Sequence, residues 1–406
     1  MVVGASLAGL RAAEALRAEG FVGHLTIVGD EPHRPYDRPP LSKQVLTGEW
    51  EPERAHLGGG GAEDLDVAWE TGVAATGLDL DQHQVSLADG RTLGYDGLVV
   101  ATGARPRTLP GTERLEGVQA LRTLEDAVAL RTAVEAGVKR VVVVGAGFIG
   151  AEVAASCRQR AVEVTMVEPL PGPLARVLGP EVSAVIADLH RQHGVDLRTG
   201  VGVASVDGDG RAERVRLTDG AVVEADVVVV GIGVVPNTQW LEGCGLAIDD
   251  GVVCDETGLA APGVVAAGDV ARWPNPRYDG ELMRVEHWEH AVNMGMHAAR
   301  RLLAEARGEP GQAFAPVPWF WSDQYDRKIQ LAGRIRPDDD LAVVAGSLAE
   351  RRFCALYGRV GRVTGVLAMN MAGRVVKYRR ALAEGDGLAW DQALADAGSR
   401  TTGSGG

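Results

Sequence analysis

The chain has 406 residues, of which 46% are hydrophobic and 24% are charged, so it can bury the cores of two or three domains and is not wholly disordered. The net charge of −14 argues against a general affinity for nucleic acid, and four cysteines without paired spacing argue against a disulfide scaffold. The longest apolar run, residues 225–235, is too short to span a bilayer, and no signal peptide precedes the first motif. We therefore expect a cytoplasmic protein with no membrane or nucleic-acid partner.

The chain opens on a glycine motif between a predicted strand and a predicted helix. Residues 2–3 are valines, segment 4–9 reads GASLAG, and a second strand-like run at 25–28 ends just before Asp30. This order is typical of a dinucleotide-binding βαβ unit, in which a carboxylate after the second strand binds a ribose. Because Ser6 stands where the middle glycine is usual, a tight turn without a nucleotide remains the alternative.

A stronger glycine motif follows about 140 residues later. Residues 140–144 form a valine-rich run, and Gly145, Gly147 and Gly150 then open a predicted helix. In such motifs the first glycine makes the turn, the second admits a pyrophosphate, and the third lets the helix pack closely. Glu168 ends the next predicted strand, where a carboxylate binds ribose hydroxyls and repels the 2′-phosphate of NADP. The pattern favours NAD binding over a turn without a ligand.

Other segments are predicted from hydrophobic periodicity and from Gly and Pro positions. Hydrophobic strands run into Gly- or Pro-containing turns within 98–106, 227–237 and 264–270. Further strands are predicted at 162–167, 328–335, 341–346, 352–357 and 362–368, and helices at 151–160, 291–307 and 376–396. Residues 401–406 are typical of a flexible tail.

Several polar or aromatic residues have both a structural and a functional interpretation. Asp269 is either a turn residue or a cofactor ligand, and Lys43, which follows two prolines, is either a surface lysine or a group that stabilises negative charge. Glu152 is either a helix N-terminal acid or a site residue. The tryptophans Trp288 and Trp321 either pack in a core or stack beside a cofactor.

Two basic sets are candidates for a partner surface. Arg374, Lys377, Arg379 and Arg380 form either a solvated face or a docking site for an acidic partner. Some members of a second set are predicted to line the partner site: Arg300, Arg301, Arg307, Arg334 and Arg336.

Seven segments, taken in order, resemble one family over nearly the whole chain. They are 4–9 (GASLAG), 38–43 (RPPLSK), 101–106 (ATGARP), 145–150 (GAGFIG), 231–237 (GIGVVPN), 267–270 (AGDV) and 318–325 (PWFWSDQY). The chain is similar to the FAD-containing, NADH-dependent ferredoxin reductases that supply cytochrome P450s and Rieske oxygenases, the putidaredoxin reductase family.

The resemblance implies an α/β fold with two Rossmann-like dinucleotide-binding domains, as in glutathione reductase, and a smaller C-terminal α+β domain. The expected domains are a discontinuous FAD-binding domain at 1–105 and 233–310, an NAD-binding domain at 106–232, and a C-terminal domain at 311–406. We expect a monomer or a weak dimer.

The resemblance also implies roles for individual residues. FAD contacts are expected from Ala8, Asp30, Lys43, Ala75, Arg122, Asp269 and Trp288. NADH contacts are expected from Ile149, Glu152, Glu168 and Arg176. We also count as cofactor-binding Gly4, Ser6, Gly9, Arg38, Gly145, Gly147, Gly150 and Gly233. The expected catalytic residues are Lys43, Glu152 and Trp321, with Lys43 paired to Glu152 and Trp321 at the exposed flavin edge.

The implied activity is electron transfer from NADH through FAD to a small iron–sulfur ferredoxin, with no metal bound by the chain itself. Rubredoxin reductase is the nearest alternative. An NADH oxidase, peroxidase or disulfide reductase needs a redox cysteine beside the flavin, yet Ser42 stands in that segment and no cysteine precedes Cys157. A signalling flavoprotein is the alternative from another class.

Overall fold

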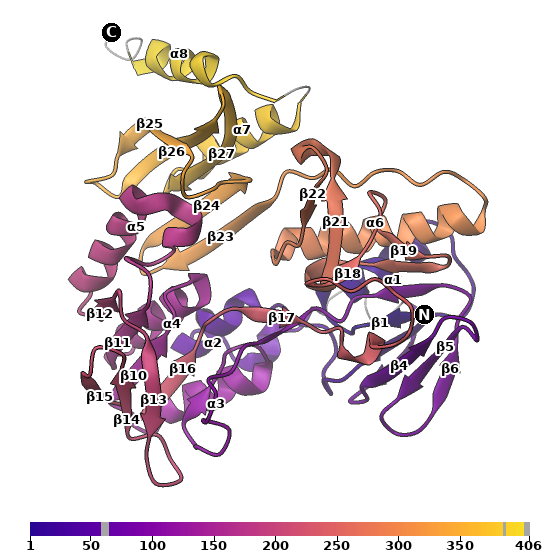
Figure 1. The fold of residues 1–406 in the computed structure, drawn as a ribbon, viewed down its shortest axis with the longest axis horizontal. Helices are drawn as coiled ribbons and strands as arrows, with labels where there is room; N and C mark the ends of the chain where they lie inside the picture. The colour runs from indigo at the N-terminus through magenta and orange to yellow at the C-terminus, as the bar shows by residue number, and fades with distance from the viewer. Residues whose placement is uncertain (58–64, 385–386, 402–406) are drawn as a thin grey trace. The chain divides into compact units, whose positions relative to one another are not determined.

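The computed structural model describes residues 1–57, 65–384 and 387–401 (Figure 1). The chain forms two compact units, each assembled from three segments. Unit 1 comprises Met1–Asp37, Glu53–Arg105 and Val234–Pro318, and unit 2 comprises Arg38–Pro52, Pro106–Gly233 and Trp319–Gly406. Most of the predicted tail, residues 402–406, lies outside the described residues.

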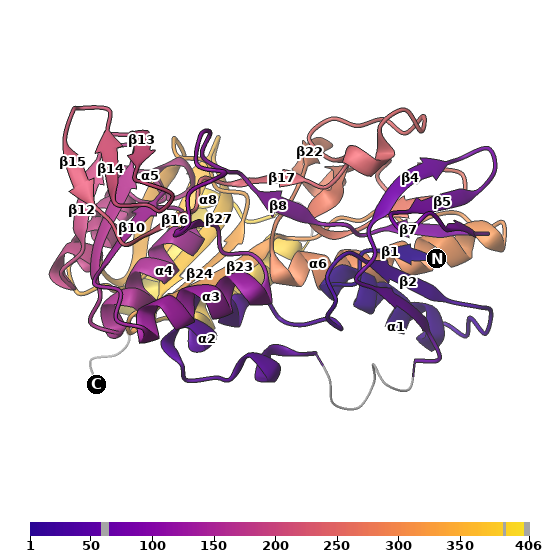
Figure 2. The ribbon, with the colours of Figure 1, turned by 90° about the horizontal axis from the view of Figure 1, so that it is seen from below.

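Unit 1 is built on a six-stranded sheet with the order β19-β20-β7-β1-β2-β3, in which only β19 runs antiparallel to its neighbour. Its strands are β1 (Val2–Val3), β2 (Thr26–Gly29), β3 (Ala68–Thr71), β7 (Leu98–Val100), β19 (Leu259–Ala261) and β20 (Val264–Ala266). Helices α1 (Leu7–Ala18) and α6 (Trp288–Ala306) pack against each other and against this sheet (Figures 1 and 2). The first glycine motif therefore lies between β1 and α1, as predicted.

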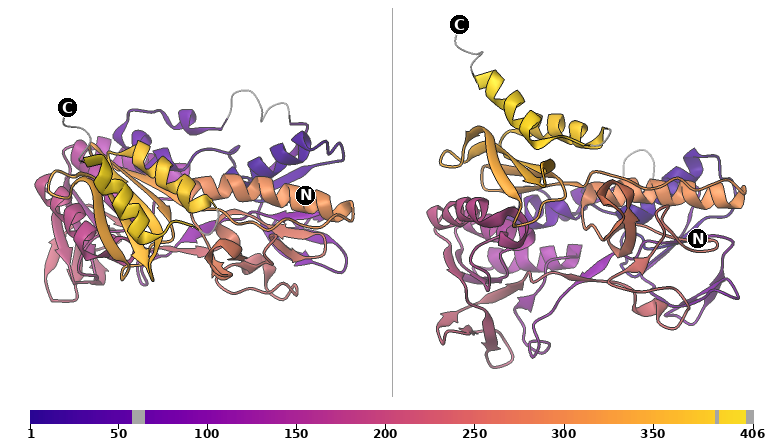
Figure 3. Two further views of the ribbon diagram at one scale, coloured as in Figure 1. Left: turned by 90° about the horizontal axis from the view of Figure 1, so that it is seen from above. Right: turned by 45° about the horizontal axis from the view of Figure 1, so that its top comes forward.

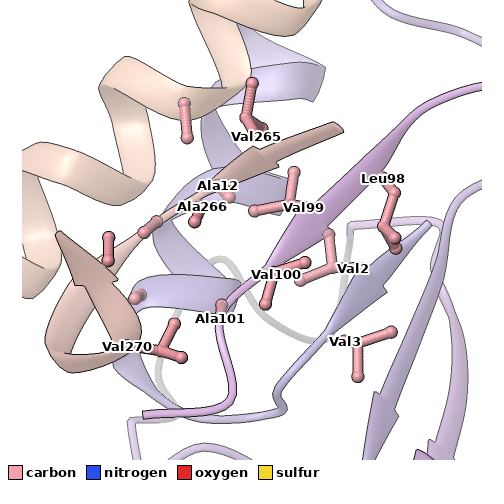
Figure 4. Packing of buried hydrophobic residues seen from close by; sticks show 14 of the residues in the cluster. Val2, Val3, Ala12, Leu98, Val99, Val100, Ala101, Val265, Ala266 and Val270 are labelled. Atoms are coloured by element: carbon pink, nitrogen blue, oxygen red, sulfur yellow. The ribbon is translucent and has the colours of Figure 1, made fainter. Parts of the chain in front are cut away.

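The core of unit 1 consists mainly of small and branched apolar side chains from the central strands. Val2, Val99 and Val265 are completely buried in neighbouring strands, and they lie together in Figure 4. Alanine and glycine let the helices come close: a Cβ at Gly295 of α6 would lie 2.4 Å from the carbonyl oxygen of Ala8 in α1. This close approach ties α6 to the first turn of α1.

Shorter elements complete unit 1. Two three-stranded sheets contain β4 (Ala75–Asp79), β5 (Gln84–Leu87) and β6 (Thr92–Gly94), and β18 (Val252–Val253), β21 (Ala271–Asn275) and β22 (Glu281–Met283). A two-stranded pair contains β8 (Ala104–Pro106) and β17 (Val234–Pro236). The 3-10 turns include η2 (Pro52–Ala55), η3 (Gln239–Leu241), η4 (Gly268–Val270) and η5 (Pro276–Tyr278).

Unit 2 is built on a five-stranded parallel sheet with the order β12-β11-β10-β16-β9. Its strands are β9 (Val118–Gln119), β10 (Arg140–Val144), β11 (Glu163–Glu168), β12 (Asp196–Thr199) and β16 (Val227–Val230). Its helices are η1 (Pro39–Ser42), α2 (Gln44–Thr47), α3 (Leu124–Glu135), α4 (Phe148–Gln159) and α5 (Ala175–Gln192). The second glycine motif connects β10 to α4, as predicted.

Both faces of this parallel sheet are covered, which explains the continuous valine runs in its strands. Val141 and Val143 pack against side chains of α3 and α4. Val142 and Val144 point the other way and pack against the antiparallel sheet of β13 (Val203–Asp207), β14 (Arg214–Leu217) and β15 (Val222–Glu224). The alternation follows from the two-residue period of a strand.

The C-terminal part of unit 2 is an antiparallel sheet with the order β23-β24-β27-β26-β25. Its strands are β23 (Trp319–Gln324), β24 (Arg327–Gly333), β25 (Asp340–Ser347), β26 (Arg352–Arg359) and β27 (Arg362–Met369). Leu178 and Val182 of α5 belong to the same buried cluster as Phe353 and Tyr357, and the Tyr357 hydroxyl donates to the Leu178 carbonyl oxygen at 2.7 Å. One hydrophobic core thus joins α5 to this sheet.

The prediction of a single helix at 376–396 is wrong. Two helices are present, α7 (Ala372–Ala383) and α8 (Trp390–Thr401), and both lie against the antiparallel sheet (Figure 3). Glu384 ends α7 with extended backbone, at φ −90° and ψ 134°. Strand β23 was also missed, because its aromatic residues gave no clear alternation of apolar and polar side chains.

The three-domain division stays a prediction. Over residues 1–57, 65–384 and 387–401, we find no helix with both the length and the apolar character that a bilayer crossing requires.

Candidate cofactor and electron-transfer site

The first glycine motif forms a closely packed turn in unit 1. Gly4 has φ +125°, and a Cβ there would lie 2.1 Å from the carbonyl oxygen of Ala101. A Cβ at Gly9 would lie 1.9 Å from the carbonyl oxygen of Gly4, so both positions need glycine. Ser6 caps α1 with extended backbone, and its hydroxyl makes no capping hydrogen bond within the described chain. The amides at the start of α1 and this hydroxyl suit a pyrophosphate.

Predicted FAD-binding residues lie near this turn. Asp30 directly follows β2, the strand beside β1, and is exposed. A Cβ at Gly268 would lie 3.0 Å from the Cβ of Ala8, so the turn that carries Asp269 packs on the first turn of α1. The structure therefore gathers Ala8, Asp30 and Asp269 around one helix N-terminus, where carboxylates can accept from ribose or ribityl hydroxyls.

Two other predicted FAD contacts lie elsewhere in unit 1. Trp288 is the first residue of α6, and its indole Nε1 donates to Asp37 Oδ1 at 2.7 Å. Ala75 begins β4 in a small antiparallel sheet, where it pairs with Leu87. The FAD contacts of both residues stay predictions.

The second glycine motif, in unit 2, has the geometry that a dinucleotide needs. Gly145 has φ +97°, and a Cβ there would lie 2.4 Å from the carbonyl oxygen of Gly231. A Cβ at Gly150 would lie 2.1 Å from the carbonyl oxygen of Gly145. By contrast, a Cβ at Gly147 would meet no heavy atom of the described chain within 4 Å. Open space therefore lies in front of α4, where a pyrophosphate would approach the backbone.

Glu168 closes the same turn from the end of β11. Its Oε2 accepts from the backbone N–H of Ala146 at 2.8 Å, and its Oε1 accepts from the N–H of Leu170 at 3.0 Å. These bonds hold the buried carboxylate against the glycine turn. A 2′-phosphate placed at this strand end would meet a fixed negative charge.

The remaining predicted nucleotide residues of unit 2 have different surroundings. Ile149, in the first turn of α4, is 46% exposed, and Arg176, in the first turn of α5, is also exposed. Gly233 accepts at its carbonyl oxygen from the N–H of Arg107 at 2.9 Å. Arg38 Nη1 donates to the carbonyl oxygen of Arg122 at 2.5 Å, so these two predicted FAD residues are neighbours. Their cofactor contacts stay predictions.

Lys43 and Glu152 form a buried ion pair in unit 2, which confirms the predicted pairing. Lys43 Nζ lies 2.6 Å from Glu152 Oε2, and the two side chains are only 12% and 3% exposed. Two hydroxyls also donate to the carboxylate: Ser42 Oγ to Oε2 at 2.5 Å and Ser322 Oγ to Oε1 at 2.7 Å. Glu152 is therefore not an exposed helix N-terminal acid. Its charge is buried and paired, and both carboxylate oxygens accept hydrogen bonds, as buried charges require.

Trp321 lies on β23, beside a second tryptophan and a basic helix. Its ring centroid is 5.3 Å from that of Trp319, and the guanidinium of Arg379 in α7 lies 5.7 Å from the Trp319 ring. An arginine over an indole face is a favourable cation–π arrangement. The predicted electron-exit residue and the basic run at 374–380 are thus close together in unit 2.

Arg301 is one of the five arginines from which the partner surface was predicted to be built, and its side chain is mostly buried. Its side chain is only 11% exposed, Nε donates to Thr257 Oγ1 at 2.8 Å, and Nη1 lies 3.5 Å from Glu305 Oε2. These contacts hold the Arg301 side chain against Thr257 and against its own helix, α6. Arg300, in the same helix, is 60% exposed and pairs with Glu19 at 2.8 Å.

Comparison with known proteins identifies the family. Residues 1–295 match the family described as pyridine nucleotide-disulphide oxidoreductase, and residues 319–401 match the family described as reductase C-terminal. The chain belongs to the pyridine nucleotide-disulphide oxidoreductase family. It is an FAD-containing, nicotinamide-dependent oxidoreductase, and both glycine turns fit such dinucleotides.

Individual relatives narrow the resemblance within this oxidoreductase family. Rhodocoxin reductase from Rhodococcus erythropolis is 40% identical over 94% of this chain and 89% of its own length. The ferredoxin–NAD(+) reductase component of a p-cumate 2,3-dioxygenase system from Pseudomonas putida is 39% identical over 82% of this chain and 80% of its own. The covalent putidaredoxin reductase–putidaredoxin complex matches with TM-score 0.88 and 35% identity over 94% of this chain and 92% of that chain. The expected resemblance to oxygenase-coupled ferredoxin reductases is confirmed.

Three of the four cysteines of this oxidoreductase are unsuited to disulfide chemistry. All four are free, and Cys157, Cys254 and Cys354 are buried. Burial raises the pKa of each of these three thiols to about 12, so the nucleophilic thiolate is scarce at neutral pH. Ser42, which stands in the segment where a redox cysteine was considered, donates instead to Glu152.

We predict that an FAD-loaded variant with alanine at all four cysteine positions will reduce ferricyanide with NADH within about twofold of the wild-type rate, because no thiolate takes part. Stopped-flow flavin reduction checks this, with circular dichroism and bound FAD as the folding controls. A folded, FAD-loaded variant that cannot be reduced by NADH would revive the disulfide-reductase alternative.

Several buried polar residues around Glu152 were not predicted as site residues from the sequence. Ser42, Ser322 and Gln324 are almost completely buried, and His190 in α5 is 0% exposed. The sequence does contain one signal for two of them. Ser322 and Gln324 are two residues apart in the aromatic-rich segment 318–325, and residues spaced by two on a strand point to the same side.

Proposed function

We propose that this oxidoreductase passes electrons from NADH through FAD to a small iron–sulfur ferredoxin that serves a cytochrome P450 or a Rieske-type oxygenase. The observation that carries the proposal is the buried Lys43–Glu152 pair beside a complete NAD-type glycine turn, in a chain 40% identical to rhodocoxin reductase. FAD, when bound, would supply the redox chemistry, which is two-electron uptake from NADH and one-electron delivery to an iron–sulfur protein. We place the protein in the cytoplasm, where NADH is available.

The chain's own residues bind and orient the reactants in this proposal. The backbone at 145–150 holds the pyrophosphate of NADH, and Glu168 selects the adenosine ribose. Lys43 supplies a fixed positive charge that stabilises negative charge developing beside it, while Glu152 fixes the ammonium group. Trp321 lies where electrons leave toward the ferredoxin.

The decisive experiment measures NADH-driven reduction of cytochrome c through a panel of purified ferredoxins, including putidaredoxin-like and Rieske-type proteins. We expect FAD to copurify and at least one ferredoxin to support turnover well above the rate without ferredoxin. If ferricyanide is reduced but every ferredoxin and rubredoxin fails, the proposed electron acceptor is wrong.

Glu168 gives the nucleotide preference. Because its fixed carboxylate repels a 2′-phosphate, we predict a kcat/KM for NADH at least about tenfold above that for NADPH, equivalent to about 1.4 kcal/mol. Steady-state ferricyanide reduction with both nucleotides measures this ratio, and Glu168→Gln should reduce it. Equal kcat/KM values for the two nucleotides in the wild-type protein would contradict the assignment.

Helix α7 is the proposed ferredoxin-docking element. Arg374 and Lys377 line one open hollow together with Arg352 of β26, and Arg379 of the same helix lies beside Trp319. Ferredoxins are typically acidic, whereas this chain carries a net charge of −14, so docking needs a local basic surface. Of the two predicted basic sets, the one on α7 lies beside the tryptophan pair of β23.

We predict that charge reversal at Arg374 or Lys377 will slow ferredoxin reduction several-fold at low salt, with a smaller effect at high salt, because rim charges act mainly on association. Ferricyanide turnover should not change, since a small oxidant needs no docked protein. Charge reversal at Arg214 of β14, an exposed arginine that belongs to neither predicted basic set, is the matched control. Unchanged ferredoxin kinetics and salt dependence in both α7 variants would exclude this surface.

We also propose that the two units contain three functional domains. Unit 1 carries the proposed FAD-binding domain, residues 106–232 carry the NAD-binding domain, and residues 311–406 form the C-terminal domain. The separate family match of residues 319–401 supports the third domain.

A further inference from the structure

A continuous chain of hydrogen bonds runs from Glu152 to the C-terminal end of α5, entirely within unit 2. Ser322 Oγ lies 2.7 Å from Glu152 Oε1, and Gln324 Nε2 lies 3.3 Å from Ser322 Oγ. Gln324 Oε1 is 3.1 Å from His190 Nε2, and His190 Nδ1 is 3.1 Å from the Tyr325 hydroxyl. Four hydrogen bonds thus connect the Lys43–Glu152 pair to Tyr325.

This chain is shielded from water along most of its length. Ser322, Gln324 and His190 are each 0% exposed, and Glu152 is 2% exposed. Only Tyr325, at the turn between β23 and β24, is half-buried, and its ring stacks on His193 with centroids 3.6 Å apart. Buried polar groups need a partner for each donor, so the protons in this chain cannot be placed freely.

The carboxylate at one end fixes the direction of every bond. A carboxylate only accepts, so Ser322 must donate its single hydroxyl proton to Glu152 and accept from the amide of Gln324. The amide oxygen of Gln324 then faces His190 Nε2, which must carry a hydrogen. Burial lowers the pKa of His190 to about 4, so the ring is neutral near pH 7 and its Nδ1 accepts from Tyr325.

We propose that Ser322, Gln324 and His190 are positioning residues. They form a hydrogen-bond chain in which every donor points the same way, and Glu152 sets that direction. The chain holds Glu152 Oε2 toward Lys43. Its effect on hydride transfer rests on the function proposed above, but its polarity does not. Two serine hydroxyls and one ammonium group then donate to the two oxygens of Glu152 and hold the carboxylate in one orientation.

The proposal makes a specific demand on the variant Glu152→Gln. Lys43 has only N–H donors, so the new amide must turn its oxygen toward Lys43 and its NH2 toward Ser322. The Ser322 hydroxyl then accepts a hydrogen bond from the new amide at position 152 and donates its own proton to Gln324. The Gln324 side chain must turn over, so that its oxygen faces Ser322 and its NH2 group faces His190 Nε2. The proton of His190 must therefore move from Nε2 to Nδ1, although the His190 ring is three hydrogen bonds away from the substitution.

Nitrogen-15 NMR of the FAD-loaded protein, labelled at histidine, tests this polarity at pH 7. We expect the Nε2–H tautomer of His190 in the wild type and the Nδ1–H tautomer in Glu152→Gln, with the resonance assigned by its loss in His190→Gln. In Gln324→Met the chain is interrupted, so adding Glu152→Gln should leave the tautomer unchanged. An Nδ1–H tautomer in the wild type, or no change in Glu152→Gln, would overturn the proposal.

A kinetic experiment tests the positioning role separately. Ser322→Ala should slow flavin reduction at saturating NADH roughly tenfold, because small displacements of a positioned group are costly, with a smaller change in KM. Ser322→Thr, which keeps the hydroxyl, should restore most of the rate. The matched control is Ser183→Ala, which also removes a buried hydroxyl, one that donates to the Pro173 carbonyl at 2.7 Å.

The two experiments separate failure of this inference from failure of the proposed function. Equal rates in Ser322→Ala and Ser183→Ala, with both proteins folded and FAD-loaded, would remove the positioning role even if ferredoxin reduction is demonstrated. If Ser322→Ala does not fold, Gln324→Met provides the same comparison one bond further from Glu152. A confirmed tautomer change with no ferredoxin turnover would instead contradict only the proposed function.

Discussion

Replacing Lys43 with methionine should slow flavin reduction by NADH about a hundredfold, because the fixed positive charge that we propose to act beside the reacting centre is lost. The same change should lower the free energy of unfolding by about 3 kcal/mol, since Glu152 is left as a buried carboxylate without its counterion. Stopped-flow absorbance of the flavin measures the rate, and urea unfolding followed by circular dichroism measures stability.

The double variant Lys43→Met/Glu152→Gln distinguishes the two effects. It removes both charges, so most of the lost stability should return, while hydride transfer should stay slow because the ammonium group is still absent. Ser42 and Ser322 can still bond the neutral amide, so no buried donor loses its partner. Wild-type stability in the single variant Lys43→Met would show that the pair is not the buried, coupled pair described here.

The sequence was sufficient for the parts of the fold that local rules determine. The valine runs before each glycine motif predicted β1 and β10, because a parallel strand covered on both faces must be apolar throughout. The positions of Gly145 and Gly150 could be predicted because any other residue would bring its Cβ too close to a backbone carbonyl oxygen. These constraints act within a few residues of the chain, so a motif captures them.

The surroundings of Glu152 depend on long-range packing. Its partners come from Ser42 after β2, from Ser322 on β23 and, through Gln324, from His190 on α5. None of these segments is adjacent in sequence, and a buried serine has no local signature that separates it from an exposed one. The break between α7 and α8 is different, because residues 384–387 read EGDG, a local turn signal that the single predicted helix passed over.

Gly147 and Gly150 look equivalent in the sequence motif, but alanine should have different effects at the two positions. Gly150→Ala should lower the free energy of unfolding by roughly 3 kcal/mol, because its Cβ would lie 2.1 Å from the Gly145 carbonyl oxygen and α4 would have to move away from β10. Gly147→Ala should change stability by less than about 0.5 kcal/mol, because Gly147 has φ −73° and open space around its Cβ position.

Binding should show the reverse order of effects. The new methyl group at position 147 would occupy the space that a pyrophosphate needs, so KM for NADH should rise at least about tenfold in Gly147→Ala. Urea unfolding and steady-state ferricyanide reduction measure both quantities in both variants, and FAD content is the control, because the first glycine motif is untouched. A stable Gly147→Ala protein with an unchanged KM would mean that the nucleotide does not approach the backbone at this turn, and the NADH site would then have to lie elsewhere.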